Sequence, residues 1–169
     1  MADHDLPAFF KFVNSKTNFS KIHYIGHSQG SMQMHVALSK RNPDVENYLG
    51  KYFAFGPVAY VKYATSHIVT LLNDSPILEW YSIRGVHEFM PSFGWFTTDA
   101  GVAFCSAFAK VCGDIMKQIM DADPSQDNYD RYDVLVGHAP AGTSIMNMKH
   151  WKQALNTGKF QAYDYGSAR

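Results

Sequence analysis

The organising segment of this chain is Lys21-Ile-His-Tyr-Ile-Gly-His-Ser-Gln-Gly30. The β-branched and aromatic residues of its first half predict a short strand, and the residues after Gly30 predict a helix. Gly26, Ser28 and Gly30 form the pattern G-x-S-x-G, in which a serine occupies a sharp turn from strand to helix. We expect this turn to strain the Ser28 backbone and to bring strand and helix so close that neither glycine could carry a Cβ.

This turn predicts a catalytic serine. It would place the Ser28 hydroxyl at the N-terminus of a helix, where the helix dipole favours negative charge. Ser28 is then the candidate nucleophile, and the backbone N–H of Gln29 is the candidate oxyanion-hole donor. His27 fills the variable position of the elbow, and we expect it to be largely buried. The five-residue pattern also occurs by chance in ordinary Gly-bounded turns, so its meaning depends on the rest of the chain.

The flanking sequence predicts a chain of three parts. Residues 1–60 have the pattern of an α/β core segment: a helix beginning near Asp5, the elbow strand, a helix over 32–38, and a buried strand over 52–59. A strand, a helix and a second strand at this spacing predict a parallel βαβ unit. Residues 61–136 instead predict a helical insertion, with helices at 68–72, 77–83, 101–111 and 115–120. Residues 137–169, with a helix at 146–155, are expected to return to the core.

The helical insertion is rich in aromatic residues and has turns expected at 73–76, 91–94 and 121–130. Aromatic side chains of this kind either pack the insertion against the core or line a pocket for an apolar substrate. They are Trp80, Tyr81, Phe89, Phe93, Trp95, Phe96, Phe104 and Phe108.

The composition limits the classes of molecule that this chain is expected to bind. The 169 residues carry 15 Lys and Arg against 15 Asp and Glu, so nothing favours nucleic acid or an anionic membrane as a partner. No run is long and apolar enough to span a bilayer, and the polar opening of the chain predicts no signal peptide. No cofactor is expected. His23 and His27 straddle a strand and a turn rather than one helix face, so no metal site is predicted.

The two cysteines and two Asn-x-Ser triplets bear on the cellular compartment. Cys105 and Cys112 are seven residues apart, which is about 10.5 Å along a continuous helix and too far for a disulfide. They are therefore either bridged across a helix break or present as two buried thiols. The triplets beginning at Asn18 and Asn73 are N-glycosylation sequons, which are compatible with the secretory pathway.

The segment His23-Tyr-Ile-Gly-His-Ser-Gln-Gly30 resembles the elbow of the acid lipases, the family of gastric and lysosomal lipases. The resemblance extends to further strings along the chain: Asp5-Leu-Pro-Ala8, Pro57-Val-Ala59, Val61-Lys-Tyr63, Pro140-Ala-Gly-Thr-Ser144, Asn147-Met148, His150-Trp151 and Gly158-Lys-Phe-Gln-Ala-Tyr-Asp164. It implies part of an α/β-hydrolase core with a helical cap, and hydrolysis of triacylglycerols or sterol esters through Ser28. It also implies a secreted or lysosomal compartment and a disulfide in the cap, near Cys112.

The resemblance also implies that this chain is a middle section that lacks the triad Asp and His and the second oxyanion donor. None of the histidines after the elbow matches a catalytic position, and we expect them to be structural or solvated: His67, His87, His138 and His150. Residues 1–169 alone are then expected to be nearly inactive, with a complementing polypeptide or other subunits covering the incomplete sheet. The alternatives are a non-catalytic lipase-like assembly subunit and a truncated sequence of such a lipase.

Overall fold

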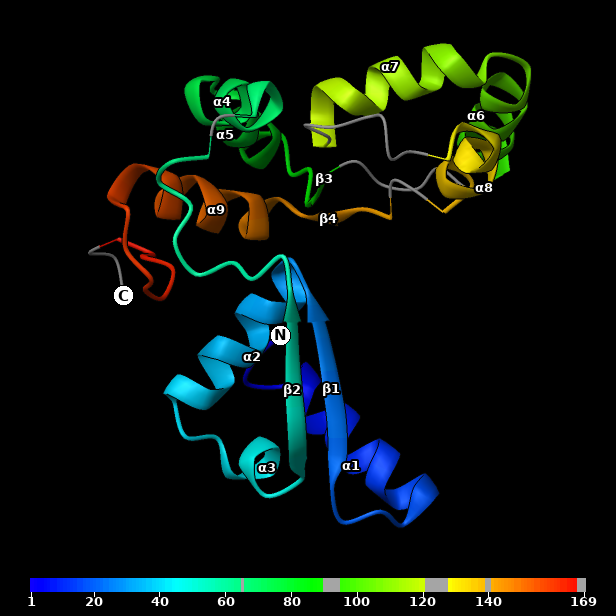
Figure 1. The fold of residues 1–169 in the computed structure, drawn as a ribbon. Helices are drawn as coiled ribbons and strands as arrows, with labels where there is room; N and C mark the ends of the chain where they lie inside the picture. The colour runs from blue at the N-terminus through cyan, green and yellow to red at the C-terminus, as the bar shows by residue number, and fades with distance from the viewer. Residues whose placement is uncertain (65, 90–94, 121–127, 139–140, 167–169) are drawn as a thin grey trace. The chain divides into compact units, whose positions relative to one another are not determined.

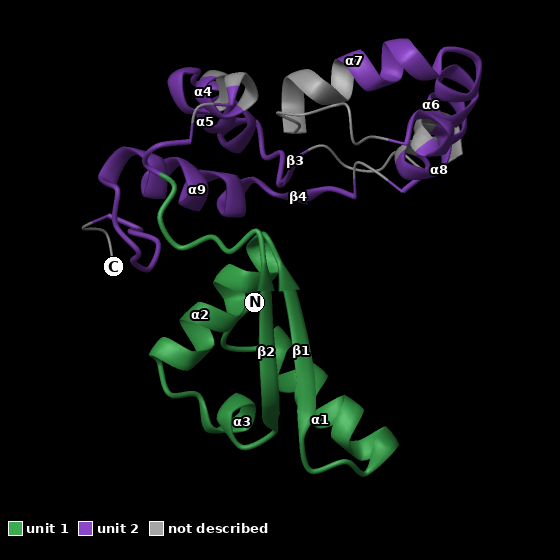
Figure 2. Cartoon of the chain, viewed as in Figure 1, with its two compact units in different colours: residues 1–61 green, residues 62–169 purple. Residues whose placement is uncertain are grey.

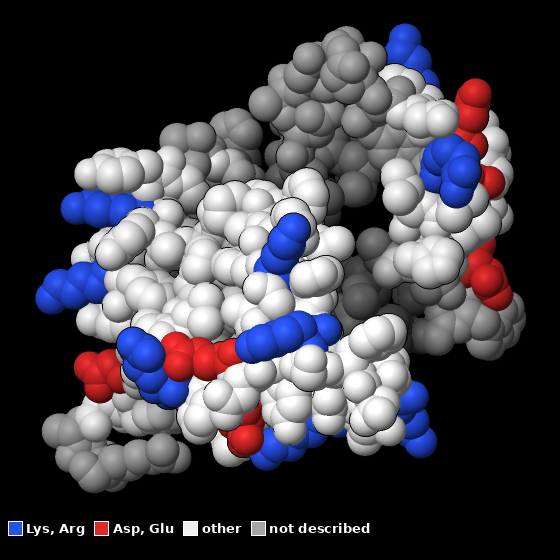
Figure 3. All heavy atoms as spheres, turned by 60° about the horizontal axis from the view of Figure 1, so that its bottom comes forward, with Lys and Arg blue, Asp and Glu red and all other residues white. Residues whose placement is uncertain are grey.

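A computed structural model describes residues 1–64, 66–89, 95–120, 128–138 and 141–166. The chain divides into two compact units, Met1–Val61 and Lys62–Arg169 (Figure 2). No helix in the described ranges is both long enough and apolar enough to cross a membrane. On the face drawn in Figure 3, acidic and basic side chains lie scattered over a mostly uncharged surface.

The first unit is a two-stranded parallel sheet with helices against it (Figure 1). Its elements in order are α1 (Asp5–Thr17), β1 (Ile22–His27), α2 (Gln29–Ser39), α3 (Pro43–Glu46) and β2 (Leu49–Phe55). The predicted strand–helix–strand unit is therefore confirmed, since β1 and β2 are parallel and α2 and α3 connect them. The second strand ends at Phe55 rather than at 59, because the chain turns at Gly56 with a φ of 52°.

Local sequence signals explain the ends of these elements. α1 carries Asp5 in its first turn, and its C-cap residue, Asn18, adopts a left-handed conformation with φ 57°. α3 was not expected from the sequence. It begins at Pro43, and the Asn42 side chain accepts a hydrogen bond from the Asp44 N–H, as an N-cap does.

The two strands are paired along most of their length, with one irregularity. Tyr24 lies opposite Tyr52 and Ile25 opposite Phe53, and the register shifts between Ile22 and Tyr24. At this bulge the Lys51 N–H donates to Nδ1 of His23 at 2.9 Å. The His23 ring therefore completes the backbone hydrogen bonding of the sheet.

The core of the first unit lies on one side of its sheet. Buried side chains from α1, α2 and α3 pack there against the inner face of the strands: Leu6, Phe10, Met34, Ala37 and Val45. Tyr24 and Tyr52 on that inner face are in contact, with their ring centroids 5.9 Å apart and their ring planes inclined at 50°.

The other face of the sheet is apolar and uncovered within this unit. Ile25 is 67% exposed, Phe53 46% and Phe55 58%. A sheet face with this composition is normally buried against another layer.

The second unit is mainly helical. It contains α4 (His67–Asp74), α5 (Ile77–Ile83), α6 (Trp95–Ala107), α7 (Ala109–Met120), a 3-10 turn at Tyr129–Arg131, α8 (Tyr132–Val136) and α9 (Ile145–Thr157). β3 (Glu88–Phe89) and β4 (Thr143–Ser144) form a short antiparallel pair. Ser144 is the N-cap of α9, and its side chain accepts from the Asn147 N–H; Gly158, with φ 65°, is the C-cap.

The expected helices of this unit are present with shifted bounds. The helix over 77–83 has the predicted limits, whereas the predicted break between 111 and 115 is wrong, because the chain breaks instead at Phe108. α8 and the β3–β4 pair were not predicted, since a five-residue helix and two-residue strands are too short to leave a periodic pattern in a sequence. The turn expected at 91–94 lies outside the described residues, as do positions 121–127 of the turn at 121–130.

Candidate active site

Ser28 lies at the junction of β1 and α2. Its backbone has φ 50° and ψ −115°, a region that side-chain-bearing residues rarely occupy. The residue is exposed, and its side chain makes no capping hydrogen bond to α2. Conformations of this kind cost about 1–3 kcal/mol and persist only where surrounding contacts hold them.

Hydrogen bonds on both sides of Ser28 hold this strained residue. Its N–H donates to the carbonyl of Phe55 on β2 at 3.0 Å. Its carbonyl accepts from the Ser31 N–H at 2.9 Å and from the Ser31 hydroxyl at 2.5 Å. The Ser28 peptide groups are therefore anchored to the neighbouring strand and to the first turn of α2.

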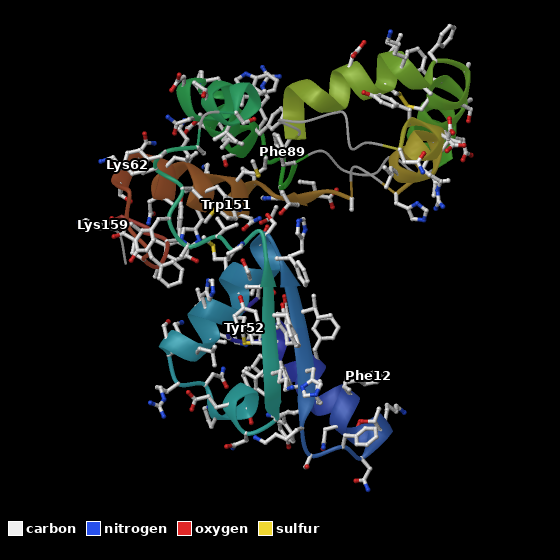
Figure 4. The ribbon with its side chains drawn as sticks, in the orientation of Figure 1. Phe12, Tyr52, Lys62, Phe89, Trp151 and Lys159 are labelled. Atoms are coloured by element: carbon white, nitrogen blue, oxygen red, sulfur yellow. A yellow bond between two sulfur atoms is a disulfide. The ribbon has the colours of Figure 1, made fainter. Side chains whose placement is uncertain are left out.

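Ser31 links the elbow to the segment after β2. Its side chain is fully buried, and its Oγ accepts from the Val58 N–H at 2.9 Å while donating to Ser28. The hydroxyl of Tyr52 donates to the Ser31 carbonyl at 3.1 Å and lies 3.2 Å from Nε2 of His35. Figure 4 labels Tyr52 between β2 and α2. These hydrogen bonds join the elbow to β2 and to the segment after it, and together they form the support of the elbow.

Sequence reasoning missed this support. Ser31 and Tyr52 are 21 residues apart, and no local pattern marks a serine and a tyrosine that meet across a βαβ unit. Nδ1 of His35 is the one buried side-chain nitrogen or oxygen without a hydrogen-bond partner among the described residues. The only available signal was the position of Ser31 one helical turn after the elbow serine.

The two elbow glycines play different parts. A Cβ on Gly26 would lie 2.8 Å from Cε1 of Tyr24 and 2.9 Å from the backbone carbonyl carbon and oxygen of Gly30, which is too close. A Cβ on Gly30 would meet only the Tyr24 hydroxyl at 3.5 Å, an ordinary contact. The expectation of a steric requirement is therefore met at Gly26 and wrong at Gly30.

His27 is exposed, so the expectation that it is buried is also wrong. It is the last residue of β1 and points to the uncovered side of the sheet, in register with the exposed Phe55. In residues 1–61, all of which are described, no histidine is hydrogen-bonded to the Ser28 hydroxyl.

Burial changes the acidity of the two tyrosines under the elbow. It raises the pKa of Tyr52 above 10.0, an effect that the hydrogen bond with Ser31 partly offsets. Burial also raises the pKa of Tyr24, with a further contribution from the charge of ionised Tyr52. Both phenols are therefore neutral hydrogen-bond donors at neutral pH, and Tyr24 donates to the Gly30 carbonyl at 3.0 Å.

The histidines of the second unit serve mainly in local contacts. His150 Nε2 lies 2.9 Å from the Gln161 carbonyl, and His138 Nδ1 lies 2.8 Å from the Val134 carbonyl. His87 is exposed, and the side chain of His67 lies outside the described residues. In the described ranges no group of three or more His, Cys, Asp or Glu residues could hold a metal ion.

Cys105 and Cys112 form a disulfide between α6 and α7, with their Cα atoms 5.5 Å apart. Phe108 interrupts the helix between them, and this break brings the two cysteines within bonding distance. The half-buried Tyr129 packs against the bridge.

The aromatic residues of the insertion are unevenly buried. Trp80 is 48% exposed, Phe104 45% and Phe108 56%. Arg84 stacks over the Trp80 ring with its guanidinium carbon 4.2 Å from the ring centroid. Tyr81 and Phe89 are half-buried, and Figure 4 labels Phe89 on β3. Phe93 and the side chains of Trp95 and Phe96 lie outside the described residues.

Comparison with known proteins identifies relatives of this chain. No family model matches it. Human (Homo sapiens) gastric triacylglycerol lipase is 38% identical over 169 residues, and human lysosomal acid lipase/cholesteryl ester hydrolase is 37% identical over 172. Human lipase member K is 34% identical over 170 residues. Each match covers 99% of this chain, which spans 42% of the relative's length. The resemblance seen in the sequence is thus confirmed: nearly the whole chain is related to the gastric and lysosomal acid lipases.

Proposed function

We propose that this chain carries the nucleophilic serine of a lipid ester hydrolase with an α/β-hydrolase core. Ser28 Oγ attacks the ester carbonyl carbon, the bond to the alkoxy oxygen breaks, and the alcohol leaves. The acyl group stays on the serine until water releases it as the carboxylic acid. The Gln29 N–H, in the first turn of α2, donates to the oxyanion that forms on the carbonyl oxygen.

The strained backbone of Ser28 is the observation that carries this proposal. Many serines precede helices as N-caps with extended backbones and side chains bonded to the helix. Ser28 instead has φ 50°, makes no capping bond, and is exposed. A strand–serine–helix turn with this geometry is the arrangement in which hydrolases of this fold expose their nucleophile. A purely assembly-related role does not require such strain.

The hydrolytic reaction needs groups beyond Ser28. A histidine must take the serine proton, and a carboxylate must orient that histidine. In α/β-hydrolases these groups follow the nucleophile in the chain order Ser, Asp or Glu, His. We assign the triad partners and the second oxyanion donor to complementing polypeptide outside residues 1–169. The exposed sheet face with Ile25, Phe53 and Phe55 is a surface that such polypeptide would cover.

The names of the relatives suggest the substrate. One is a triacylglycerol lipase and another a cholesteryl ester hydrolase, so a long apolar ester is the proposed substrate and lipid degradation the proposed role. Residues 61–136 would form the cap over the acyl chain and residues 137–169 the return to the core. The same names suggest a secreted or lysosomal compartment.

The test is a chimera in which residues 1–169 replace the matching segment of human gastric triacylglycerol lipase. We expect the chimera to hydrolyse a short-chain nitrophenyl ester and to react with a fluorophosphonate at Ser28. Residues 1–169 alone should be nearly inactive. Ser28→Ala should reduce kcat by at least about a thousandfold, because an acyl-enzyme route cannot start without the nucleophile.

Ser39→Ala is the matched control. Ser39 lies at the other end of α2, is exposed, and should leave kcat unchanged. Hydrolysis that survives Ser28→Ala, or fluorophosphonate attached to a different serine, would show that Ser28 is not the nucleophile. Full activity of residues 1–169 alone would refute the assignment of the triad partners to other polypeptide.

A further inference from the structure

We propose that Asn18 is a site of N-linked glycosylation and that the second sequon, at Asn73, is not. This inference rests on the secretory compartment proposed above, but it does not depend on the hydrolytic role of Ser28. The two triplets are Asn18-Phe-Ser20 and Asn73-Asp-Ser75. Both match the Asn-x-Ser pattern, and the structure places them in different environments.

The first sequon forms an exposed turn. Asn18 is the C-cap residue of α1, has a left-handed conformation and leads into the loop before β1. Asn18 and Ser20 are exposed, and Phe19 between them is 67% exposed. Figure 4 labels Phe12, another exposed aromatic residue, on the same helix. An asparagine in a surface loop is the usual setting of a glycan.

Neighbouring groups hold the backbone of this turn and leave the Asn18 side chain available. The Asn18 N–H donates to the Asn14 carbonyl at 2.8 Å, and Asn14 Nδ2 donates to the Phe19 carbonyl at 2.8 Å. Within the described part of the chain, no hydrogen bond involves the Asn18 amide group. A sugar on Nδ2 would therefore break no contact of the fold.

The second sequon is part of a helix contact. Asn73 is half-buried near the end of α4. Its side-chain amide is paired with that of Asn156 on α9. Asn73 Nδ2 donates to Asn156 Oδ1 at 3.4 Å, and Asn156 Nδ2 donates to Asn73 Oδ1 at 3.0 Å. The Ser75 carbonyl accepts from the Lys152 ammonium at 3.0 Å. A glycan at Asn73 would separate α4 from α9, and Pro76 also restricts the backbone of Ser75.

The position of Asn18 is compatible with the elbow. Asn18 precedes the start of β1 and Ser28 follows its end, so the two are separated by a six-residue strand of about 20 Å. A glycan at Asn18 therefore projects from the opposite end of the strand and does not obstruct the serine.

The modification itself requires a lipid-diphosphate-linked oligosaccharide as donor and a transferase of the secretory pathway. Asn18 Nδ2 forms a bond to the anomeric carbon of the sugar and loses one proton. The bond from that carbon to the diphosphate oxygen breaks, and the lipid diphosphate leaves. No electrons are exchanged with another reactant.

The experiment expresses the full chain behind a cleavable secretory leader in eukaryotic cells, with a control sequon appended after Arg169. Glycosidase release in ¹⁸O-labelled water converts each glycosylated Asn to a mass-labelled Asp, which peptide mass spectrometry then locates. We expect label at Asn18 and at the control sequon, and none at Asn73. Ser20→Ala should abolish the mobility shift due to the Asn18 glycan, and Ser20→Thr should retain it.

Two results would overturn the proposal: a glycosylated control sequon with unmodified Asn18, or a glycan at Asn73. Ser28→Ala should leave the glycan pattern unchanged. Failure of the glycosylation proposal is therefore distinguishable from failure of the hydrolase proposal, which the ester assay tests.

Discussion

Gly26 shows how a single residue determines the geometry of the elbow. The strand and the helix meet at this position, where even one methyl group would overlap the Tyr24 ring and the backbone of Gly30. Ser28 bears the resulting backbone strain. The Ser31 hydroxyl offsets that strain by binding the Ser28 carbonyl while it satisfies the Val58 N–H.

The contrast between the two glycines is a prediction about stability. Gly26→Ala should lower the free energy of unfolding of the chain by about 1–3 kcal/mol, because the added methyl group overpacks the junction. Gly30→Ala is the matched control and should cause no loss, since Gly30 lies in α2 and alanine favours helices by about 1 kcal/mol. Urea denaturation of both variants measures the difference, and equal destabilisation would contradict the steric argument.

At the scale of elements, α2 is joined to β2 through Tyr52. The Tyr52 hydroxyl bonds the Ser31 carbonyl on α2, and its ring packs beside Tyr24 of β1. Because burial raises the pKa of Tyr52, the neutral phenol is favoured in the folded state. The stability that this preference contributes is fully present below the unfolded pKa of about 10 and is lost as the pH rises through the higher folded value.

Tyr52→Phe should therefore change the pH dependence of stability. At pH 7 the variant should be less stable by about 0.5–1.5 kcal/mol, because the bond to Ser31 is lost. Above pH 10 the wild-type chain should lose stability more steeply than the variant. Denaturation curves at pH 7, 10 and 11 test this, with the exposed Tyr63→Phe as control. Identical pH slopes for wild type and Tyr52→Phe would contradict a coupling between this phenol and folding.

The Cys105–Cys112 disulfide is also a contact between elements, since it joins α6 to α7 across the break at Phe108. Mass measurement under non-reducing conditions should find no free thiol in the chain, and two free thiols would contradict the bridge. Replacing both cysteines by serine should lower the free energy of unfolding by about 2–3 kcal/mol through the greater entropy of the open chain. Ser106→Ala, an exposed neighbour on α6, is the control.

At the scale of the whole molecule, the chain forms two units that each pack around internal contacts. In the first unit, helices cover only one face of the sheet. A two-stranded sheet also leaves one edge of each strand without a partner. Exposed edges and apolar faces promote association with other chains. This feature supports the proposal that further polypeptide packs on the first unit.

Residues 1–169 alone should consequently self-associate through the uncovered face. Replacing Ile25 and Phe53, which lie opposite each other in the sheet, by threonine should reduce association while retaining strand propensity. Phe9→Gln removes an exposed aromatic residue of α1 and should have a smaller effect. Sedimentation velocity over a concentration series measures association, and equal effects of both changes would show that the sheet face is not responsible.

Some features of this protein could be read directly from consecutive residues. The elbow from Gly26 to Gly30, the parallel strands and the helix at 77–83 follow from local propensity and sterics, which neighbouring residues contain. The lipase resemblance likewise rests on short strings such as the elbow motif. The Cys105–Cys112 pair remained open from sequence because a bridge needed a helix break whose position was not predictable.

Other features depend on contacts between residues that are distant in the chain, so only the folded structure decides them. The Ser31 hydroxyl meets the Val58 N–H, and the Tyr52 hydroxyl meets the Ser31 carbonyl, only after β2 has paired with β1. The tolerance of Gly30 for a Cβ, the exposure of His27 and the difference between the two sequons arise in the same way. Each depends on which distant atoms occupy the space around a side chain, and a linear pattern does not specify those atoms.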